Sequence, residues 1–439
     1  MRESASRLRH VAKAVRSRRG TVATAFAVSA TALLGMVALA AEGGVWQLQQ
    51  RNARTAADLA ALAGATAIEN GTNAVNIATD AATRNGFTNN GDGGRTLVNV
   101  NRPPLSGTYA GNASAIEVVV RQTQNLGMAR LALGTAPLVQ SRAVALNSLD
   151  VNACLLALGG GLALGGNSTM NAQRCALAAN STQYGINIFG SATVRASDLV
   201  TTGSCTGCSS GNVWTDNTMT QRPSVVANRQ SPVADPYRNL QNWTPTPPAC
   251  ATTVRTNSFA NQNAADGALC NVTLGPNDTL NLNSGLYYVK GNLDIRGTLR
   301  SVGSGGVTLV LTGDNTSDIG RITINAQSRV DITGPTTSLI PGYAEGKGVV
   351  IYRDARATNN GPQNEVKLNG GSDMRIVGAV YLPTSDVQVN GNNGTNYSTC
   401  MPVVGYALSF SGTSDTRIDV SGCNNFAAVP QLRTPRLVE

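Results

Sequence analysis

The sequence predicts a single N-terminal transmembrane helix, a membrane-proximal α/β domain and a distal all-β domain, for which a parallel β-solenoid is favoured and a β-sandwich is the alternative. Three features carry this prediction: an uncharged apolar stretch behind a basic segment, an Ala-rich helical pattern that follows it, and a short alternating strand that recurs from about residue 151. With 439 residues, of which 41% are hydrophobic, the chain can bury more than one core.

The predicted span covers residues 20–41, where no charged side chain occurs. A helix of about twenty such residues, rising about 1.5 Å per residue, crosses a hydrocarbon core of roughly 30 Å. Because basic flanks stay on the side of synthesis, the basic tail of residues 1–19 is expected in the cytoplasm and everything after the span outside it. The residues expected to flank the anchor are Arg16, Arg18, Arg19 and Glu42.

A cleaved signal peptide is the alternative to an anchor, because Ala38-Leu-Ala40 offers small residues to a peptidase. The apolar stretch is longer than a signal-peptide core of about 7 to 15 residues. The helical pattern also continues beyond it, through Trp46 and Leu59. These two features favour an uncleaved anchor.

The charge of the chain is concentrated at its start. The net charge of +9 falls to +3 without residues 1–20, which hold seven basic groups and one acidic group. Since the basicity reflects membrane topology, we expect no nucleic-acid partner and a lipid bilayer instead.

All eight cysteines lie beyond the span: Cys154, Cys175, Cys205, Cys208, Cys250, Cys270, Cys400 and Cys423. An even number in an exported region indicates disulfides, and pairing of sequence neighbours is the expectation, 154 with 175, 205 with 208, 250 with 270 and 400 with 423. Cys205-Thr-Gly-Cys208 could instead be a redox pair or half of a zinc site. Gly and Ser surround it, and no exported histidine or second CxxC motif could complete four zinc ligands, so a loop staple is favoured and no metal or cofactor is expected.

Residues 42–150 are predicted to form the α/β domain. Its first helix has a face of small residues, namely Ala56, Ala57, Ala60, Ala63 and Ala65. That face is expected to pack on the domain's own sheet, and the alternative is a close-packed seam with another subunit in a homo-oligomer. The expected elements are helices at about 45–68 and 74–84, strands at 96–101, 115–122 and 138–146, and a short helix near 126–133.

An internal repeat begins near residue 151, in which a short alternating strand meets a small residue and a second short strand follows. The strands are seen at Leu162-Ala-Leu164, Ile186-Asn-Ile188, Leu293-Asp-Ile295, Ile322-Thr-Ile324, Val366-Lys-Leu368 and Leu408-Ser-Phe410. Alternation sends one set of side chains inward, and stacked units of this kind make a β-solenoid. A β-sandwich also has alternating strands, and the irregular spacing of the repeats keeps it open.

The boundaries predicted for the distal region follow from this repeat. Residues 151–200 and 276–425 are expected to form the solenoid turns. The Cys/Pro-rich residues 201–275 are expected to be a disulfide-pinned loop that wraps over the solenoid or joins two parts of it, and residues 426–439 a flexible tail.

No catalytic residue is assigned, and we expect the protein not to be an enzyme. The one histidine, His10, precedes the span, which removes histidine-dependent triads from the exported region. A polysaccharide lyase on a solenoid face would need only acidic and basic groups, and its best candidates are Lys347, Arg353, Asp354 and Arg356. A solvated loop after a buried strand is the favoured interpretation of these four residues.

The N-terminal third resembles a known family. The Arg19-Gly20 junction, the small-residue span, Glu42-Gly43 and NARTAADLAALAGA at 52–65 resemble Tad (tight adherence) pilus-assembly proteins of the TadE/TadG-like group. GTYAGNASAIEVVV at 107–120 and SRAVAL at 141–146 extend the resemblance more loosely. Ala25 stands where prepilin-like relatives carry Glu, which argues against processing as a pseudopilin.

This resemblance implies a membrane-anchored structural or assembly protein of a Tad/Flp-type pilus or surface-attachment system. It would lie in the inner membrane with a cytoplasmic N-terminus and a periplasmic C-terminal region. Its partners would be other pilus-assembly or envelope proteins. The alternative is an exported adhesin or carbohydrate-binding β-solenoid protein.

Overall fold

The computed structural model describes residues 4–439 apart from 70–72, 132, 230–231, 326, 359–365, 370–373, 391–397 and 414. The chain forms two compact units. Unit 1 comprises Met1–Ser148 and Thr434–Glu439, and unit 2 comprises Leu149–Arg433.

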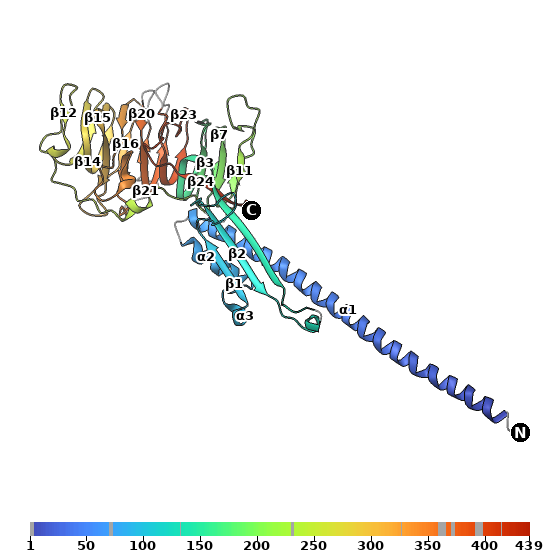
Figure 1. The fold of residues 1–439 in the computed structure, drawn as a ribbon. Coiled ribbons are helices and arrows are strands. Elements are labelled where there is room, and N and C mark those ends of the chain that lie inside the picture. The colour runs from blue at the N-terminus through green and yellow to red at the C-terminus, as the bar shows by residue number, and fades with distance from the viewer. Residues whose placement is uncertain are drawn as a thin grey trace. The chain divides into compact units, whose positions relative to one another are not determined.

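Unit 1 is organised around one long helix, α1 (Ser4–Glu69), of 66 residues. Alanine and leucine dominate its sequence, and both favour helix because they lose little side-chain entropy there. Figure 1 shows α1 in blue, extending well beyond the strands of unit 1. Among the described residues this is the one helix long and apolar enough to cross a membrane, over the stretch Val22–Ile68.

A three-stranded antiparallel sheet packs beside the second half of α1. Its strands are β1 (Thr96–Asn101), β2 (Ala115–Thr123) and the first part of β3 (Leu138–Leu164), with β2 in the centre. Helix α2 (Ala74–Arg84) packs against α1 and β1, and Asn73 caps it by accepting a hydrogen bond from the Asn76 N–H. Two short helices complete the unit, α3 (Gly91–Gly94) and the 3-10 turn η1 (Met128–Leu131).

The small-residue face of α1 is part of the core of unit 1. Ala56, Ala57, Ala60 and Ala65 are fully buried, together with Ile116 and Val118 of β2. Gly64 allows the closest approach, since a Cβ there would stand 2.6 Å from Cδ1 of Ile116. The prediction of a seam with another subunit is therefore wrong for these four alanines, because the sheet of the same chain already covers them, whereas Ala63 is half-buried.

Unit 2 is an all-β region whose strands are mostly short. In chain order after β3 they are β4 (Thr169–Ala172), β5 (Ala176–Ala179), β6 (Ile186–Ile188), β7 (Thr193–Ala196), β8 (Asp198–Thr201), β9 (Cys205–Thr206), β10 (Val213–Trp214), β11 (Ser224–Val226), β12 (Asn261–Gln262), β13 (Leu269–Leu274), β14 (Thr279–Ile295), β15 (Thr298–Thr312), β16 (Ile322–Ile324), β17 (Arg329–Thr333), β18 (Val349–Arg353), β19 (Val366–Leu368), β20 (Met374–Val377), β21 (Ala379–Val389), β22 (Val403–Phe410), β23 (Asp415–Arg417) and β24 (Gln431–Leu437). Three 3-10 turns lie between them, η2 (Arg238–Asn242), η3 (Ala264–Asp266) and η4 (Ala344–Gly346).

The repeat found in the sequence is a ladder of parallel strands. Leu162 pairs with Ile186 on one side and with Leu408 on the other. The ladder continues from Leu408 through Val387 to Val366, and Ile322 pairs with Leu293 further along. Equivalent apolar residues therefore stack on each other and form a fully buried core of Leu, Ile and Val.

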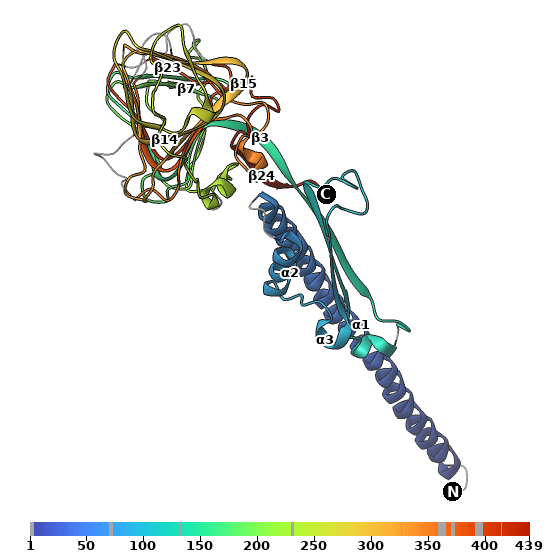
Figure 2. The same cartoon turned by 90° about the vertical axis from the view of Figure 1, so that its left-hand side faces the viewer.

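Part of this ladder closes on itself. The pairings β14–β15, β15–β18, β18–β21, β21–β19, β19–β16 and β16–β14 make a closed, barrel-like parallel sheet of six strands. Closure is possible because β14, β15 and β21 are long and contribute different parts of their length to different pairings. Figure 2, which views unit 2 nearly along the stack, shows successive strands overlapping in one outline. The parallel pairing does not fit the antiparallel sheets of a sandwich, and the solenoid stays a prediction.

The chain does not build the stack in one direction. From β3 it runs to β11, and Figure 1 shows β11 and the next strand, β12, at opposite ends of unit 2. From β12 the strands return toward the start, until β22 pairs with β3 from Val403 to Phe410, with a shift of register between Gly405 and Ala407. The first strand of the stack is therefore an internal one.

Residues 227–229 and 232–260 belong to the crossing between the two ends, and aromatic rings hold part of the second segment on the strands. Trp243 stacks on Tyr352 with 5.6 Å between ring centroids, and Tyr237 lies 5.3 Å from Tyr381. Asp235 accepts a hydrogen bond from the Tyr381 hydroxyl at 2.8 Å.

The prediction of a flexible tail at 426–439 is wrong. Residues 431–437 form β24, and the N–H of Val438 donates to the carbonyl of Val144. The Glu439 carboxylate also pairs with Arg142 at 2.6 Å. A terminal segment is ordered when such partners hold it. Neither the hydrogen bond to Val144 nor the ion pair with Arg142 could be predicted from the sequence of the tail alone.

Candidate functional site

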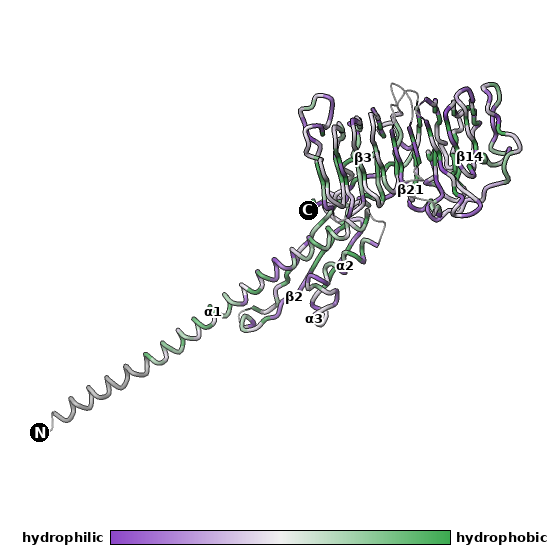
Figure 3. The backbone as a smooth tube through the Cα atoms, turned by 180° about the vertical axis from the view of Figure 1, so that it is seen from behind, coloured by the Kyte–Doolittle hydropathy of each residue, from purple (hydrophilic) through white to green (hydrophobic). Residues whose placement is uncertain are grey.

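The first candidate site is the exposed apolar part of α1. Eight large apolar side chains between residues 22 and 39 are at least 40% exposed: Val22, Phe26, Val28, Leu33, Leu34, Met36, Val37 and Leu39. Figure 3 shows the hydropathy of this stretch along the backbone. A continuous apolar surface of this size requires a partner. Because the surface surrounds the helix, a lipid bilayer is a partner that can cover it on all sides.

Glu42 ends the uncharged stretch and is held by backbone donors. The N–H of Gly127 donates to one carboxylate oxygen at 3.2 Å, and the N–H of Ala129 donates to the other at 3.1 Å. The approach is close, because a Cβ at Gly127 would stand 2.7 Å from a Glu42 oxygen and the carboxylate would have to shift. The carboxylate thus keeps hydrogen bonds next to the apolar stretch, where it would otherwise lose water. The side chains of the other predicted flank residues, Arg16, Arg18 and Arg19, lie outside the described part.

A second contact fixes the sheet along α1. The side-chain amide of Gln50 donates to the carbonyl of Gln140 at 2.8 Å. The contact between α1 and the sheet also has nearly the same length along the helix as along the strand. Glu42 and Gly64 are 22 residues apart on the helix, about 33 Å, and their partners Gly127 and Ile116 are 11 residues apart, about 36 Å if extended. The turn between β2 and β3 therefore lies level with the end of the apolar stretch.

An ion-pair network lies at the opposite end of the sheet of unit 1. The carboxylate of Glu117, buried on β2, accepts hydrogen bonds from Arg142 at 2.5 Å and Asn101 at 2.9 Å. Burial alone would raise the pKa of Glu117, but the hydrogen bonds outweigh burial and hold this pKa below its usual value. Arg142 also bridges to Glu439, which raises the pKa of the guanidinium.

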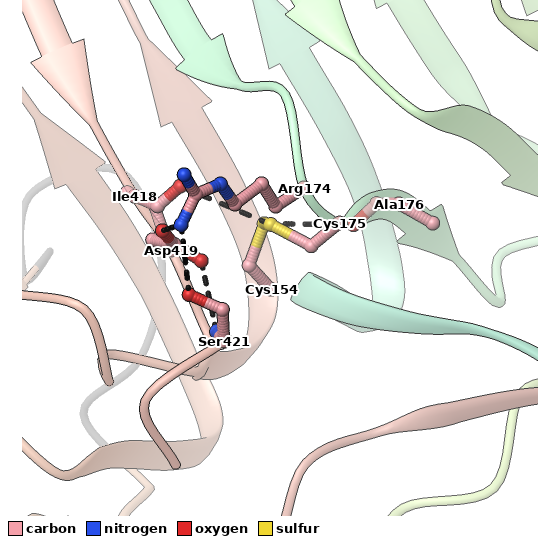
Figure 4. The surroundings of a disulfide bond; sticks show 7 residues. All are labelled: Cys154, Arg174, Cys175, Ala176, Ile418, Asp419 and Ser421. Carbon is pink, nitrogen blue, oxygen red and sulfur yellow. Dashed lines mark hydrogen bonds and ion pairs between the residues drawn. A yellow bond between two sulfur atoms is a disulfide. The ribbon is translucent and has the colours of Figure 1, made fainter.

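The structure joins the cysteines in the four expected pairs. Cys154 and Cys175 connect two neighbouring strands of the parallel ladder, just beside the paired residues Ala153 and Ala176. Figure 4 shows this disulfide close to Arg174, which is 3.7 Å from the Asp419 carboxylate. With Cys205 bonded to Cys208, this pair is a staple at the edge strand β9.

The residues of the lyase alternative do not form an exposed catalytic cluster. Arg353 is fully buried and donates to the carbonyls of Gly320 and Ile319 and to the Ser385 hydroxyl. Asp354 is also buried and accepts a hydrogen bond from the Thr312 hydroxyl at 3.0 Å and several from Arg356, of which the shortest is 2.6 Å. The prediction of a solvated loop is therefore wrong for Arg353 and Asp354, because the hydrogen bonds of these side chains connect the ends of buried strands.

A polar groove lies on one face of unit 2. Its volume is about 530 Å³, and its lining residues are Ser258, Thr279, Thr298, Arg300, Arg329, Val330, Asp331 and Arg375. Arg375 pairs with Asp331 at 2.9 Å across adjacent strands, and Arg300 donates to the Asn281 side chain at 2.6 Å. Three guanidinium groups and one carboxylate give the groove a positive balance, which suits an anionic ligand. Within the described residues, no group of three His, Cys, Asp or Glu side chains could hold a metal ion.

Sequence reasoning missed several of these groups. Glu42 was expected at the membrane edge, but its partners are backbone N–H groups, which carry no sequence signal. Arg142 and Asp235 were missed because their partners, Glu439 and Tyr381, are far away in the chain. The groove could have been suspected from the basic residues that recur on outward-facing positions of the repeat.

The comparisons with known proteins agree with the site at the N-terminus. Residues 20–67 match a family model described as Putative Flp pilus-assembly TadE/G-like. No curated protein and no solved structure matches the chain. The match lies on the helix that is able to span a membrane, which supports a pilus-related, membrane-anchored protein. Residues 20–67 of this chain are therefore similar to the Tad domain of Flp pilus-assembly TadE/G-like proteins.

Proposed function

We propose that this chain is a structural or assembly protein of a Tad/Flp-type pilus or surface-attachment system. It is anchored in the inner membrane by residues 20–41, with its N-terminus in the cytoplasm and the chain beyond the span, including all of unit 2, in the periplasm. Its partners are the bilayer and other pilus-assembly or envelope proteins, and unit 2 is a β-solenoid that it presents to them. The single observation that carries the proposal is the Tad match on an exposed apolar helix.

The anchor is tested by placing charge in the span. Arginine near the centre of a membrane helix costs about 2.5 to 3.5 kcal/mol, so Leu33→Arg with Leu34→Arg should move the protein out of the membrane fraction after alkaline extraction. Leu48→Arg is the matched control, since Leu48 is 56% exposed and lies beyond Glu42. Equal retention of both variants would contradict the anchor. Orientation is tested with Val75→Cys, which should react with an impermeant maleimide once the outer membrane is opened.

The pilus role is tested in a deletion strain. Loss of surface pili and of adhesion is expected, with rescue by the wild-type chain and no rescue by the Leu33→Arg, Leu34→Arg variant. Normal pili and unchanged adhesion in the deletion strain would overturn the proposal.

We further propose that the protein is not an enzyme. The support is that Arg353 and Asp354, the best candidates for a lyase, make internal hydrogen bonds. Cleavage of a polyuronate by the purified protein would contradict this.

A second candidate function, binding of an anionic carbohydrate, is favoured by the arginines of the groove on unit 2. Arg300→Gln should weaken binding of polyuronate oligosaccharides, measured by calorimetry. Arg296→Gln is the control, because Arg296 is exposed and is not among the lining residues. Wild-type protein that binds no polyuronate would remove this candidate.

A further inference from the structure

The turn between β2 and β3 is a second apolar surface in unit 1. We define the hairpin tip as residues 124–131 and 133–138. Its large apolar side chains Met128, Leu133 and Leu138 are 56%, 38% and 57% exposed. Gln124 and Ala129 are buried, so the tip is a packed turn with its apolar side chains directed outward.

The hydrogen bonds of Glu42 determine where this surface lies. Both carboxylate oxygens of Glu42 are taken by N–H groups of the tip, from Gly127 and Ala129. Glu42 is the first charged residue after the apolar stretch. A group bonded to it stands within about one helical turn, or roughly 5 Å, of the point where the apolar stretch ends.

We propose that the hairpin tip lies in the surface layer of the bilayer, with Met128 and Leu133 among the lipid headgroups and upper acyl chains. This inference rests on the proposed membrane anchor. The exposed Arg130 of the tip lies between them in sequence and can reach lipid phosphates while its stem stays in the apolar layer.

The tip gives unit 1 a second attachment to the membrane. A single helix leaves a domain free to rotate about the helix axis and to tilt. Because the tip and α1 are joined through Glu42 and through Gln50 and Gln140, a tip seated in lipid sets the rotation of α1 and the side of unit 1 that faces the membrane.

The test uses single cysteines in the full-length protein. All eight native cysteines are in disulfides, so an introduced cysteine can be labelled alone with an environment-sensitive fluorophore. The variants are Met128→Cys in the tip, Phe26→Cys in the span, and Val75→Cys as control. Val75 is 37% exposed on α2, which packs beside Gly64, about 33 Å further along α1 than Glu42.

Each labelled protein is reconstituted into vesicles of phosphatidylcholine and phosphatidylglycerol that contain a lipid with a shallow nitroxide quencher. Loss of fluorescence is expected at residues 128 and 26 and no loss at residue 75. Quenching at 26 without quenching at 128 would overturn the seated tip and leave the anchor standing, and a protein partner for the tip would then be sought. No quenching at either position would overturn the anchor itself. Equal quenching at 75 and 128 would also overturn the proposal, because α1 would then lie along the surface.

The same arrangement is tested from the side of Glu42. Glu42→Ala removes the acceptor of both tip N–H groups and should reduce the quenching of a label at residue 128 without changing that at residue 26. Glu42→Gln keeps one acceptor oxygen and should restore part of it. Unchanged quenching at residue 128 in Glu42→Ala would contradict the inference that the Glu42 carboxylate holds the tip in place.

Discussion

Units 1 and 2 obtain their order from opposite sources. In unit 1 an antiparallel sheet rests on an alanine face, and single close contacts decide the packing, such as Gly64 against Ile116 and Glu42 against the hairpin tip. In unit 2 parallel strands repeat, and each strand takes its register from the one below. A change in unit 1 should therefore act locally, whereas a change inside unit 2 should loosen several neighbouring strands.

The largest effect is expected from Arg353→Ala in unit 2. Its removal leaves three buried acceptors without their donor and opens a cavity, at a cost of about 3 to 5 kcal/mol of unfolding free energy. Denaturant unfolding measures this loss of stability in a variant that keeps Trp243 as its one tryptophan. Trp243 is a suitable probe because it stacks on Tyr352, the residue before Arg353. Arg375→Ala is the control, because its ion pair with Asp331 is exposed and is worth about 0.2 to 1 kcal/mol. Equal losses in both variants would mean that burial of Arg353 does not stabilise the stack.

The disulfides test the contribution of the repeat itself. Cys154→Ala with Cys175→Ala opens a loop of 21 residues, whereas Cys205→Ala with Cys208→Ala opens a loop of 3. On the chain-entropy account, the first pair should lower the unfolding free energy by about 3 kcal/mol and the second by about 1.5. The same Trp243 unfolding assay compares them. A larger loss from the short loop would show that strand contacts, and not loop closure, govern the stability of unit 2.

A smaller and local effect is expected in unit 1 from Ala60→Leu. Ala60 is fully buried against the sheet, and overpacking costs about 1 to 3 kcal/mol. Thr55→Leu adds a similar side chain at an exposed position of the same helix and should change stability by less than about 0.5 kcal/mol. Unfolding of unit 1 is followed by the fluorescence of Trp46 in a variant that keeps it as the one tryptophan. Unfolding of unit 2 is followed in the same way with the variant that keeps Trp243. A loss in unit 2 as large as that in unit 1 would contradict the local character of unit 1.

Local patterns in the sequence predicted much of both units, because they depend on neighbouring residues. The strand predicted at 96–101 coincides with β1, and the helix predicted at 74–84 coincides with α2. The repeated strands fall into one ladder because their alternating apolar residues must all face the same core.

The order of the strands in the stack could not be predicted in the same way. Every turn presents similar apolar edges, so no local pattern indicates that β22 pairs with β3 or that the chain crosses between the ends of the stack after β11. β24 was missed because Pro435 and the closeness of the chain end argue against a strand. The anchor flank was predicted from charge, but the hydrogen bonds of Glu42 depend on a turn 85 residues away.

The smallest effects, and the ones of opposite sign in the two units, are expected from pH. In unit 1 hydrogen bonds lower the pKa of Glu117 from 4.5, so its contribution is present above pH 4.5 and is lost as the pH falls through the lowered value. In unit 2 burial raises the pKa of Asp235 from 3.8, so its contribution is present below 3.8 and is lost as the pH rises through the raised value. Acidification should therefore weaken unit 1 through Glu117 while it neutralises the half-buried charge of Asp235.

Two isosteric variants separate these contributions. Glu117→Gln should flatten the acid dependence seen with Trp46 and lower stability at neutral pH, because the ion pair with Arg142 is lost. Asp235→Asn should flatten the dependence seen with Trp243 and leave stability at neutral pH equal or higher, because it removes a half-buried charge while its carbonyl can still accept from the Tyr237 N–H. If both substitutions shifted their unfolding curves in the same direction with pH, the two carboxylates would be equivalent. The contrast between Glu117, whose pKa is lowered by its hydrogen bonds, and Asp235, whose pKa is raised by burial, would then fail.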